Sequence, residues 1–162
     1  MISGSSLKFY GAAALVVIAD QLTKAAARAG LQQGREVTVI PGFFDLKLSY
    51  NTGGAFGILP GWAPMLILIG LVLVFAVVRL RQLGPQGRSL SLGLALLLGG
   101  GVGNLIDRVF SPVHEVTDFI SLYVRTGGQE HRWPTFNVAD AAIVVGAVFV
   151  IYFVFIVKRR ME

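Results

Sequence analysis

Four apolar segments, each about as long as a membrane-spanning helix, constrain this chain more than any other feature. They cover residues 7–27, 62–80, 90–110 and 138–157. About 20 apolar residues are needed to cross the hydrocarbon core of a bilayer, so four transmembrane helices are expected. The composition agrees, because only 14% of the residues are charged, against roughly 25% in a soluble domain. We therefore predict an all-α membrane protein with a small β element, folded as one domain over residues 1–162.

The first segment needs separate treatment because Ala25–Ala27 resembles the cleavage site of a removable leader. In a leader, the apolar core runs directly into such small residues. Here Asp20, Gln21, Thr23 and Lys24 separate the core from the alanines. We therefore predict a spanning helix with a polar outer end.

Basic residues set the expected orientation of the helices. Arg79, Arg81 and Arg88 surround the connection between the second and third segments, and such loops face the cytoplasm. With four spans, both termini are then cytoplasmic, which agrees with Lys8 near the start and residues 158–160 near the end. These flanks account for much of the net charge of +5, so nucleic acid is not an expected partner.

Two stretches are then expected outside the cytoplasm. The first, 30–61, contains a strict alternation of apolar and polar residues over 44–50, which is typical of a half-buried strand. Residues 37–40, followed by the turn residues Pro41 and Gly42, predict a partner strand. The result is a small sheet on the membrane surface between the first two helices. The second stretch, 111–136, is rich in proline and glycine and predicts a loop that contains one short helix at most.

This topology brings the polar residues of three helices and two loops to one depth, at the outer leaflet. They are Asp20, Lys24, Asn104, Asp107, Arg108, Asn137, Asp140, Asp118 and the turn-like segment Asn51-Thr52-Gly53-Gly54. Structural roles explain several of them singly: Asn137 and Asp140 as a helix cap, and Asp20 and Lys24 as an ion pair. Glycines between 99 and 103 suit close packing of helices. These roles do not explain the common depth.

The residue types at this depth narrow the chemistry. The chain has no cysteine and two histidines, which excludes thiol catalysis and makes a histidine-rich zinc site improbable. Two aspartates held close together share a proton, so one acts as an acid while the other activates water. A transporter or channel would use the same acids to bind a cation or relay protons, and a non-catalytic membrane scaffold is a further alternative. Transporter sites lie near the midplane, often between internal repeats; this sequence shows neither feature.

Five separated blocks, in order, resemble those of the lipoprotein signal peptidase (signal peptidase II) family of bacteria. They read DQLTK at 20–24, NTGGAF at 51–56, GNLIDR at 103–108, VTDF at 116–119 and FNVAD at 136–140. The resemblance implies an aspartyl endopeptidase of the inner membrane with its site at the outer leaflet. It implies cleavage of diacylglyceryl-modified prolipoproteins on the amino side of the lipid-modified cysteine. The implied reaction requires no metal or cofactor. We expect a monomer whose partners are these substrates and membrane lipids.

The resemblance also assigns residues. It places the catalytic dyad at Asp118 and Asp140. Supporting or substrate-binding roles pass to Asn51, Gly53, Asn104, Asp107, Arg108, Asn137, Asp20 and Lys24. The connection 109–116 is longer than the family pattern, so Asp107 is the alternative partner for Asp140.

Overall fold

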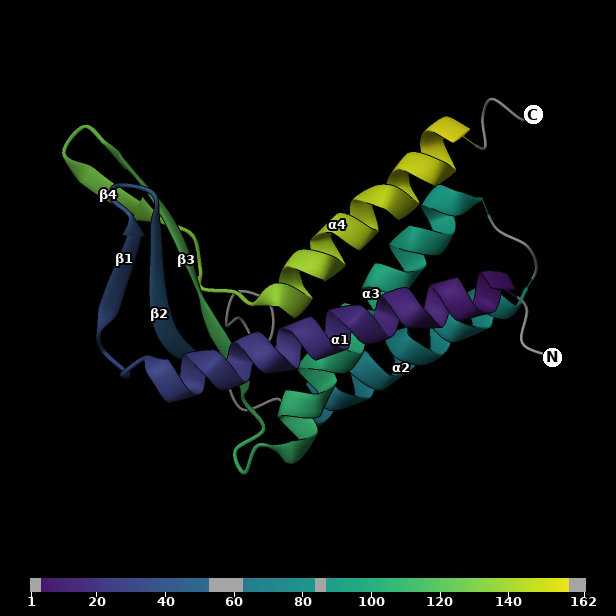
Figure 1. The fold of residues 1–162 in the computed structure, drawn as a ribbon, viewed down its shortest axis with the longest axis horizontal. Coiled ribbons are helices and arrows are strands. Elements are labelled where there is room, and N and C mark those ends of the chain that lie inside the picture. Colours follow the sequence, from purple (N-terminus) through teal and green to yellow (C-terminus); the bar gives the residue numbers. More distant parts are fainter. Residues whose placement is uncertain (1–3, 53–62, 84–86, 158–162) are drawn as a thin grey trace.

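Helices and strands separate into two parts, a helical bundle and a sheet at one end of it (Figure 1). The structure is a computed structural model that describes residues 4–52, 63–83 and 87–157. The elements are α1 (Gly4–Gly30), β1 (Glu36–Ile40), β2 (Phe44–Asn51), α2 (Ala63–Gln82), α3 (Arg88–Phe110), β3 (Val116–Thr126), β4 (Gln129–Arg132), α4 (Val138–Tyr152) and a final π-helical turn, η2 (Phe153–Val157). The predicted helices are confirmed to within a few residues, whereas Gly53, Gly54, Trp62 and 158–160 lie outside the described residues.

Helix α3 is the centre of the bundle, since it packs against α1, α2 and α4. Both α1 and α3 run toward the sheet, while α2 and α4 run away from it (Figure 1), as the alternating topology predicts. The predicted glycine packing is confirmed. A Cβ atom at Gly99 would lie 2.7 Å from the carbonyl oxygen of Ala13 in α1, and one at Gly100 would collide with the carbonyl oxygen of Ala139 in α4. Only glycine lets all three backbones approach this closely.

Among the described residues, three helices are long and apolar enough to cross a membrane: Pro64–Gln82, Arg88–Phe110 and Val138–Phe155. Helix α1 has 27 residues, or about 40 Å at 1.5 Å per residue, so it has sufficient length. It is less apolar because it carries charged side chains, including Asp20 and Lys24, which are fully buried. The structure is therefore that of a multi-helix membrane protein. The polar side chains Asp20 and Lys24 of α1 are directed into the protein interior.

Within the described part of the chain, the sheet has four antiparallel strands in the order β1-β2-β3-β4. The predicted pair β1–β2 is confirmed, with Gly42 at φ +80° in the turn. The prediction of a loop with at most one short helix over 111–136 is wrong, because this stretch supplies β3 and β4. The sheet is therefore built from both outer stretches and not only from the one between α1 and α2. Gly127 and Gly128, both with positive φ, form the two-residue hairpin turn that glycine favours.

The sequence did not predict strand β3, because the first half of the strand is buried on both faces. Val116, Thr117, Asp118 and Phe119 are all buried, so apolar and polar residues do not alternate as they do in a half-exposed strand. The strand pairs with β2 between Val116 and Leu122 and with β4 between Tyr123 and Thr126. Its place at the centre of the sheet positions Asp118 against the helices.

We expect Gly100→Ala to destabilise the protein by about 1–3 kcal/mol, the usual cost of overpacking. The new methyl group would collide with the backbone of Ala139, which cannot move without shifting α4. Gly101→Ala is the matched control: its methyl group would lie 3.4 Å from a Val74 side chain, and alanine favours helix. Chemical denaturation of the two variants in detergent micelles measures the difference. Equal stabilities would contradict the packing argument.

Candidate active site

The polar site begins with Lys24, whose side chain is fully buried between α1, α3 and α4. Its Nζ atom lies 2.8 Å from Asp20 Oδ2 and 3.2 Å from Asp107 Oδ2, and it donates to Asn104 Oδ1 at 3.0 Å. The other oxygen of Asp20 accepts from the backbone N–H of Ala139 at 2.9 Å, in the first turn of α4. The predicted Asp20–Lys24 pair is thus confirmed, and it joins three helices.

Two asparagine side chains carry the network from Lys24 to the aspartates. Asn104 Nδ2 donates to Asp140 Oδ1 at 2.7 Å. Asn137 Nδ2 donates to Asp118 Oδ1 at 2.7 Å and to Asn104 Oδ1 at 3.1 Å. Asn137 also forms the predicted cap of α4, because its Oδ1 accepts from the Asp140 N–H while Asp140 Oδ2 accepts from the Asn137 N–H. Asn137 therefore contacts both aspartates of the expected dyad.

Asp118 is 1% exposed, and its other carboxyl oxygen accepts from Asn51 Nδ2 at 3.3 Å. Burial, followed by the nearby charge of Asp140, raises the pKa of Asp118 to about 7. Hydrogen bonds from Asn137 and Asn51 oppose this rise, since they favour the ionised carboxylate. Near neutral pH, Asp118 is therefore poised between its protonated and ionised forms.

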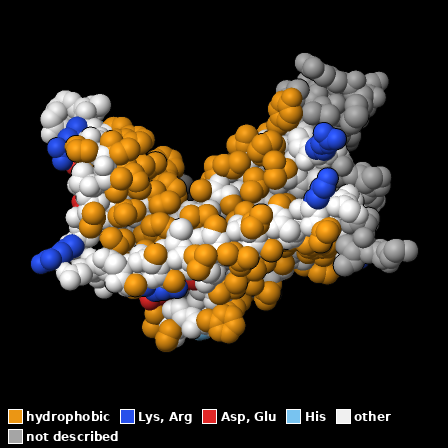
Figure 2. Space-filling view, viewed as in Figure 1, with side chains coloured by type: hydrophobic (Ala, Val, Ile, Leu, Met, Phe, Trp, Pro, Cys, Tyr) orange, Lys and Arg blue, Asp and Glu red, His pale blue; other side chains and the backbone are white. Residues whose placement is uncertain are grey.

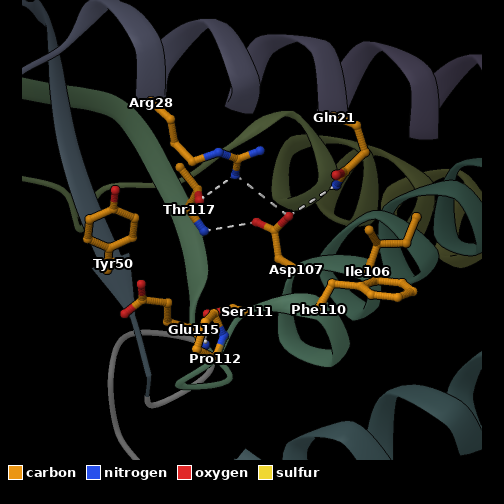
Figure 3. Close-up of a pocket in the computed structure, with 10 residues that line it drawn as sticks. All are labelled: Gln21, Arg28, Tyr50, Ile106, Asp107, Phe110, Ser111, Pro112, Glu115 and Thr117. Carbon is orange, nitrogen blue, oxygen red and sulfur yellow. Dashed lines mark hydrogen bonds and ion pairs between the residues drawn. The ribbon is translucent and has the colours of Figure 1, made fainter.

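Asp107, the alternative partner for Asp140, has a different environment. Its Oδ2 binds Lys24 and accepts from the backbone N–H of Thr117 at 2.9 Å. Its Oδ1 accepts from Gln21 Nε2 at 3.2 Å and lies 4.0 Å from Arg28 Nη1 (Figure 3). Both oxygens are thus engaged in holding α1, α3 and β3 together. This arrangement favours Asp118 over Asp107 as the chemical partner of Asp140.

Arg108 follows Asp107 but supports a different part of the chain. It is 8% exposed, and its Nη1 donates to the carbonyl oxygen of His114 at 3.2 Å. The His114 ring nitrogen Nδ1 in turn lies 2.7 Å from the Arg108 carbonyl oxygen, and His114 has a positive φ of 57°. The pair closes the connection from α3 to β3, so His114 helps to fix the path of the chain between them.

Three contributors were not predicted as site residues: Gln21, Arg28 and Thr117. Gln21 Nε2 donates to Asp20 and to Asp107. Arg28 Nη1 donates to Thr117 Oγ1 at 2.8 Å. The spacing Asp20-Lys24-Arg28 on one helix face is a signal that could have pointed to Arg28. Thr117 had no such signal, because its contacts depend on the position of β3.

A hollow opens between the sheet and α4, and hydrophobic side chains cover both of its walls (Figure 2). Helix α4 begins at the base of the hollow (Figure 1), with Asp140 in its first turn. Helix α4 has several exposed apolar side chains, among them Val144, Val145 and Val148. Two carboxyl groups joined through one asparagine, beneath apolar walls, can share a proton and activate water beside an apolar substrate.

The family model of signal peptidase (SPase) II matches residues 12–156. The chain belongs to the signal peptidase II family. It is 38% identical to a lipoprotein signal peptidase of Sulfurihydrogenibium, with 96% of each chain covered. It is 41% identical to that of Pseudomonas putida, over 91% of this chain and 86% of the relative. A bacterial membrane enzyme solved by the in meso method superposes with a TM-score of 0.85 at 29% identity, covering 96% of this chain and 92% of that one.

Membership of the signal peptidase II family confirms the resemblance drawn from the five sequence blocks. It identifies the chain as a peptidase. The two other classes considered from the sequence, a transporter and a non-catalytic scaffold, are therefore set aside. The comparisons do not assign individual residues, so the roles of Asp118 and Asp140 rest on geometry.

We expect Asp118→Asn to stabilise the protein at pH 8.5 and not at pH 4. The raised pKa means that folding favours the protonated carboxyl group, so its contribution is lost as the pH rises through about 7. Asparagine cannot ionise and escapes this loss, which is on the order of a few kcal/mol at about 1.4 kcal/mol per pKa unit. Denaturation in micelles at the two pH values measures the effect.

Asp107→Asn is the control, since it removes a partner of buried Lys24 and should destabilise the protein at both pH values. A stability difference between Asp118→Asn and the unmodified protein that stays constant with pH would contradict the assignment.

Proposed function

We propose that this protein removes signal peptides from diacylglyceryl-modified prolipoproteins, cutting on the amino side of the lipid-modified cysteine. The curated relatives carry the name lipoprotein signal peptidase, which supports this substrate class. The observation that carries the chemistry is the bridge made by Asn137, whose side-chain Nδ2 donates to Asp118 Oδ1 and whose backbone N–H donates to Asp140 Oδ2. We infer that these two aspartates form the catalytic dyad.

The dyad acts with one shared proton. Asp118, with a pKa of about 7, holds the proton and gives it to the substrate. Asp140, which accepts hydrogen bonds from Asn104 Nδ2 and from the Asn137 N–H, acts as the base. It takes a proton from water, whose oxygen attacks the scissile carbonyl carbon. Asp140 then gives the proton that it took from water to the cysteine nitrogen, and the carbon–nitrogen bond breaks so that this nitrogen leaves as an amine. As the intermediate collapses to a carboxylic acid, one of its hydroxyl groups returns a proton to Asp118.

Supporting residues set the position of the dyad without reacting. Asn104 and Asn137 hold the carboxyl groups, and Lys24 orients Asn104 through its carbonyl oxygen. Asn51 donates to Asp118 from the end of β2. The substrate's signal helix and acyl chains lie in the hollow between the sheet and α4, whose walls are apolar (Figure 2).

The same proposal extends to the membrane. Four helices, α1 included, span the bacterial cytoplasmic membrane as one domain, with both termini in the cytoplasm. Support comes from the basic residues Arg79, Arg81 and Arg88 at the end of the bundle away from the sheet, because loops rich in arginine remain cytoplasmic. The sheet and the dyad are then at the outer leaflet. We propose that the protein acts as a monomer without a metal or cofactor.

Cleavage of a diacylglyceryl-prolipoprotein by purified protein in detergent tests the dyad. Asp118→Asn and Asp140→Asn should each lower the rate by about 10²–10⁴-fold or more, the usual contribution of a general acid or base. A chelator should have no effect. Asp107→Asn, which changes a carboxyl group bound to Lys24 and Thr117, should retain cleavage in whatever fraction stays folded, as judged by gel filtration. Full activity of either dyad variant would refute the assignment.

The pH profile provides an independent test of the acid. Because Asp118 must be protonated, kcat/KM should fall as the pH rises through about 7, by about tenfold per unit beyond it. Asn51→Ala removes a hydrogen bond that lowers the pKa of Asp118, so the alkaline fall should begin at a higher pH in this variant. A rate that is constant from pH 6 to pH 9 would show that Asp118 is not the acid.

A further inference from the structure

A cavity of about 330 Å³ lies between α1, α3, β2 and the start of β3 (Figure 3). Successive side chains of a strand point to opposite faces. Thr117 lines this cavity, whereas its neighbour Asp118 reaches Asn137 and Asn51. The cavity is therefore separate from the dyad. Its volume falls within the range of about 300–1,000 Å³ that is usual for small-molecule sites.

The cavity offers one positive and one negative group to a ligand. Asp107 lines it too, but its carboxylate is already bound to Lys24 and the Thr117 N–H. The Arg28 side chain is 40% exposed, and its Nη1 donates a hydrogen bond to Thr117 Oγ1. Its ion pair with Asp107 is long, with 4.0 Å between Nη1 and Oδ1. The Glu115 carboxylate has no hydrogen bond or ion pair within the described part of the chain. Arg28 and Glu115 enter the cavity from opposite sides, α1 and the connection after α3 (Figure 3).

The remaining lining is amphipathic. Tyr50 contributes a phenol, and Ile106 and Phe110 form an apolar side. Phe110 is 80% exposed and is the last residue of the candidate span Arg88–Phe110. The end of a span lies at the level of lipid headgroups. The polar cavity thus opens beside an exposed aromatic ring at the depth where headgroup and acyl chain meet.

We propose that this cavity binds a phospholipid headgroup that carries both a phosphate and a primary ammonium, as in phosphatidylethanolamine. Arg28 binds the phosphate, since its planar guanidinium suits two oxygens of a phosphate. Glu115 accepts hydrogen bonds from the ammonium, and an acyl chain follows Phe110 into the bilayer. A headgroup with one charge of each sign has a partner for both groups: its phosphate for Arg28 and its ammonium for Glu115. A purely anionic headgroup would be repelled by Glu115. The site is independent of the proposed cleavage reaction.

Isothermal titration calorimetry of the full-length protein in detergent, with short-chain dihexanoyl lipids, tests the proposal. Dihexanoyl-phosphatidylethanolamine should bind about tenfold more tightly than the phosphatidylglycerol analogue, the effect of one charge-assisted hydrogen bond. Glu115→Gln should remove this preference and leave phosphatidylglycerol binding no weaker. Arg28→Gln should weaken both lipids by about tenfold. Arg125→Gln, at an exposed arginine of β3, is the matched control and should change neither.

Retention of the preference in Glu115→Gln, or unchanged affinities in Arg28→Gln, would overturn the proposal. If Arg125→Gln weakened lipid binding as much as Arg28→Gln does, the binding would be non-specific, and the proposal would be overturned as well. If Arg28→Gln fails to fold, the ratio of the two affinities in Glu115→Gln decides alone. Soluble glycerophosphoethanolamine should bind more weakly than the lipid; equally tight binding would refute a lipid ligand. None of these measurements uses a prolipoprotein, so failure here leaves the proposed peptidase reaction untouched.

Discussion

The fold depends on one buried ammonium group. Lys24 is fully buried, and a lysine has three N–H donors. One is directed to Asp20, one to Asp107 and one to Asn104, so none is left without an acceptor. Removing either carboxylate would take a counter-charge from the buried ammonium group in a medium of low dielectric constant, at a cost of several kcal/mol. The cation therefore requires α1 and α3 to meet at one height, and Asp20 and Asp107 extend this constraint to α4 and β3.

The same charge determines which way the neighbouring amides point. Asn104 Oδ1 faces Lys24, so its Nδ2 is left to donate to Asp140. Asn137 Nδ2 then donates to Asn104 Oδ1 and to Asp118. An amide has its donor and acceptor on opposite sides, so the orientation set at Lys24 passes through both asparagines to the two carboxyl groups. Lys24 forms no hydrogen bond or ion pair with Asp118 or Asp140, yet its position decides which hydrogen-bond donors these two carboxyl groups meet.

The sequence predicted the helices well and the sheet only in part, for a physical reason. Strand β2 exposes one face, so its alternating pattern reveals it; the first half of β3 is buried on both faces and shows no alternation. The glycines of α3 were correctly assigned to packing, because a cluster of small residues in an apolar helix has few other uses. The polar residues of α1, α3 and α4 were correctly placed at one end of the bundle, since helix direction follows from the number of spans.

The sequence by itself determined the membrane class, the alternating helices, the Asp20–Lys24 pair and the cap of α4, all of which depend on residues near one another in the chain. Only the tertiary structure shows how the environments of Asp118 and Asp107 differ. These two residues are 11 positions apart in sequence, but Asp107 faces Lys24 and the Thr117 N–H while Asp118 faces Asn137. Which partner each carboxyl group finds depends on how β3 packs against the helices, and that packing is formed by residues distant in the chain, beyond the reach of any local pattern.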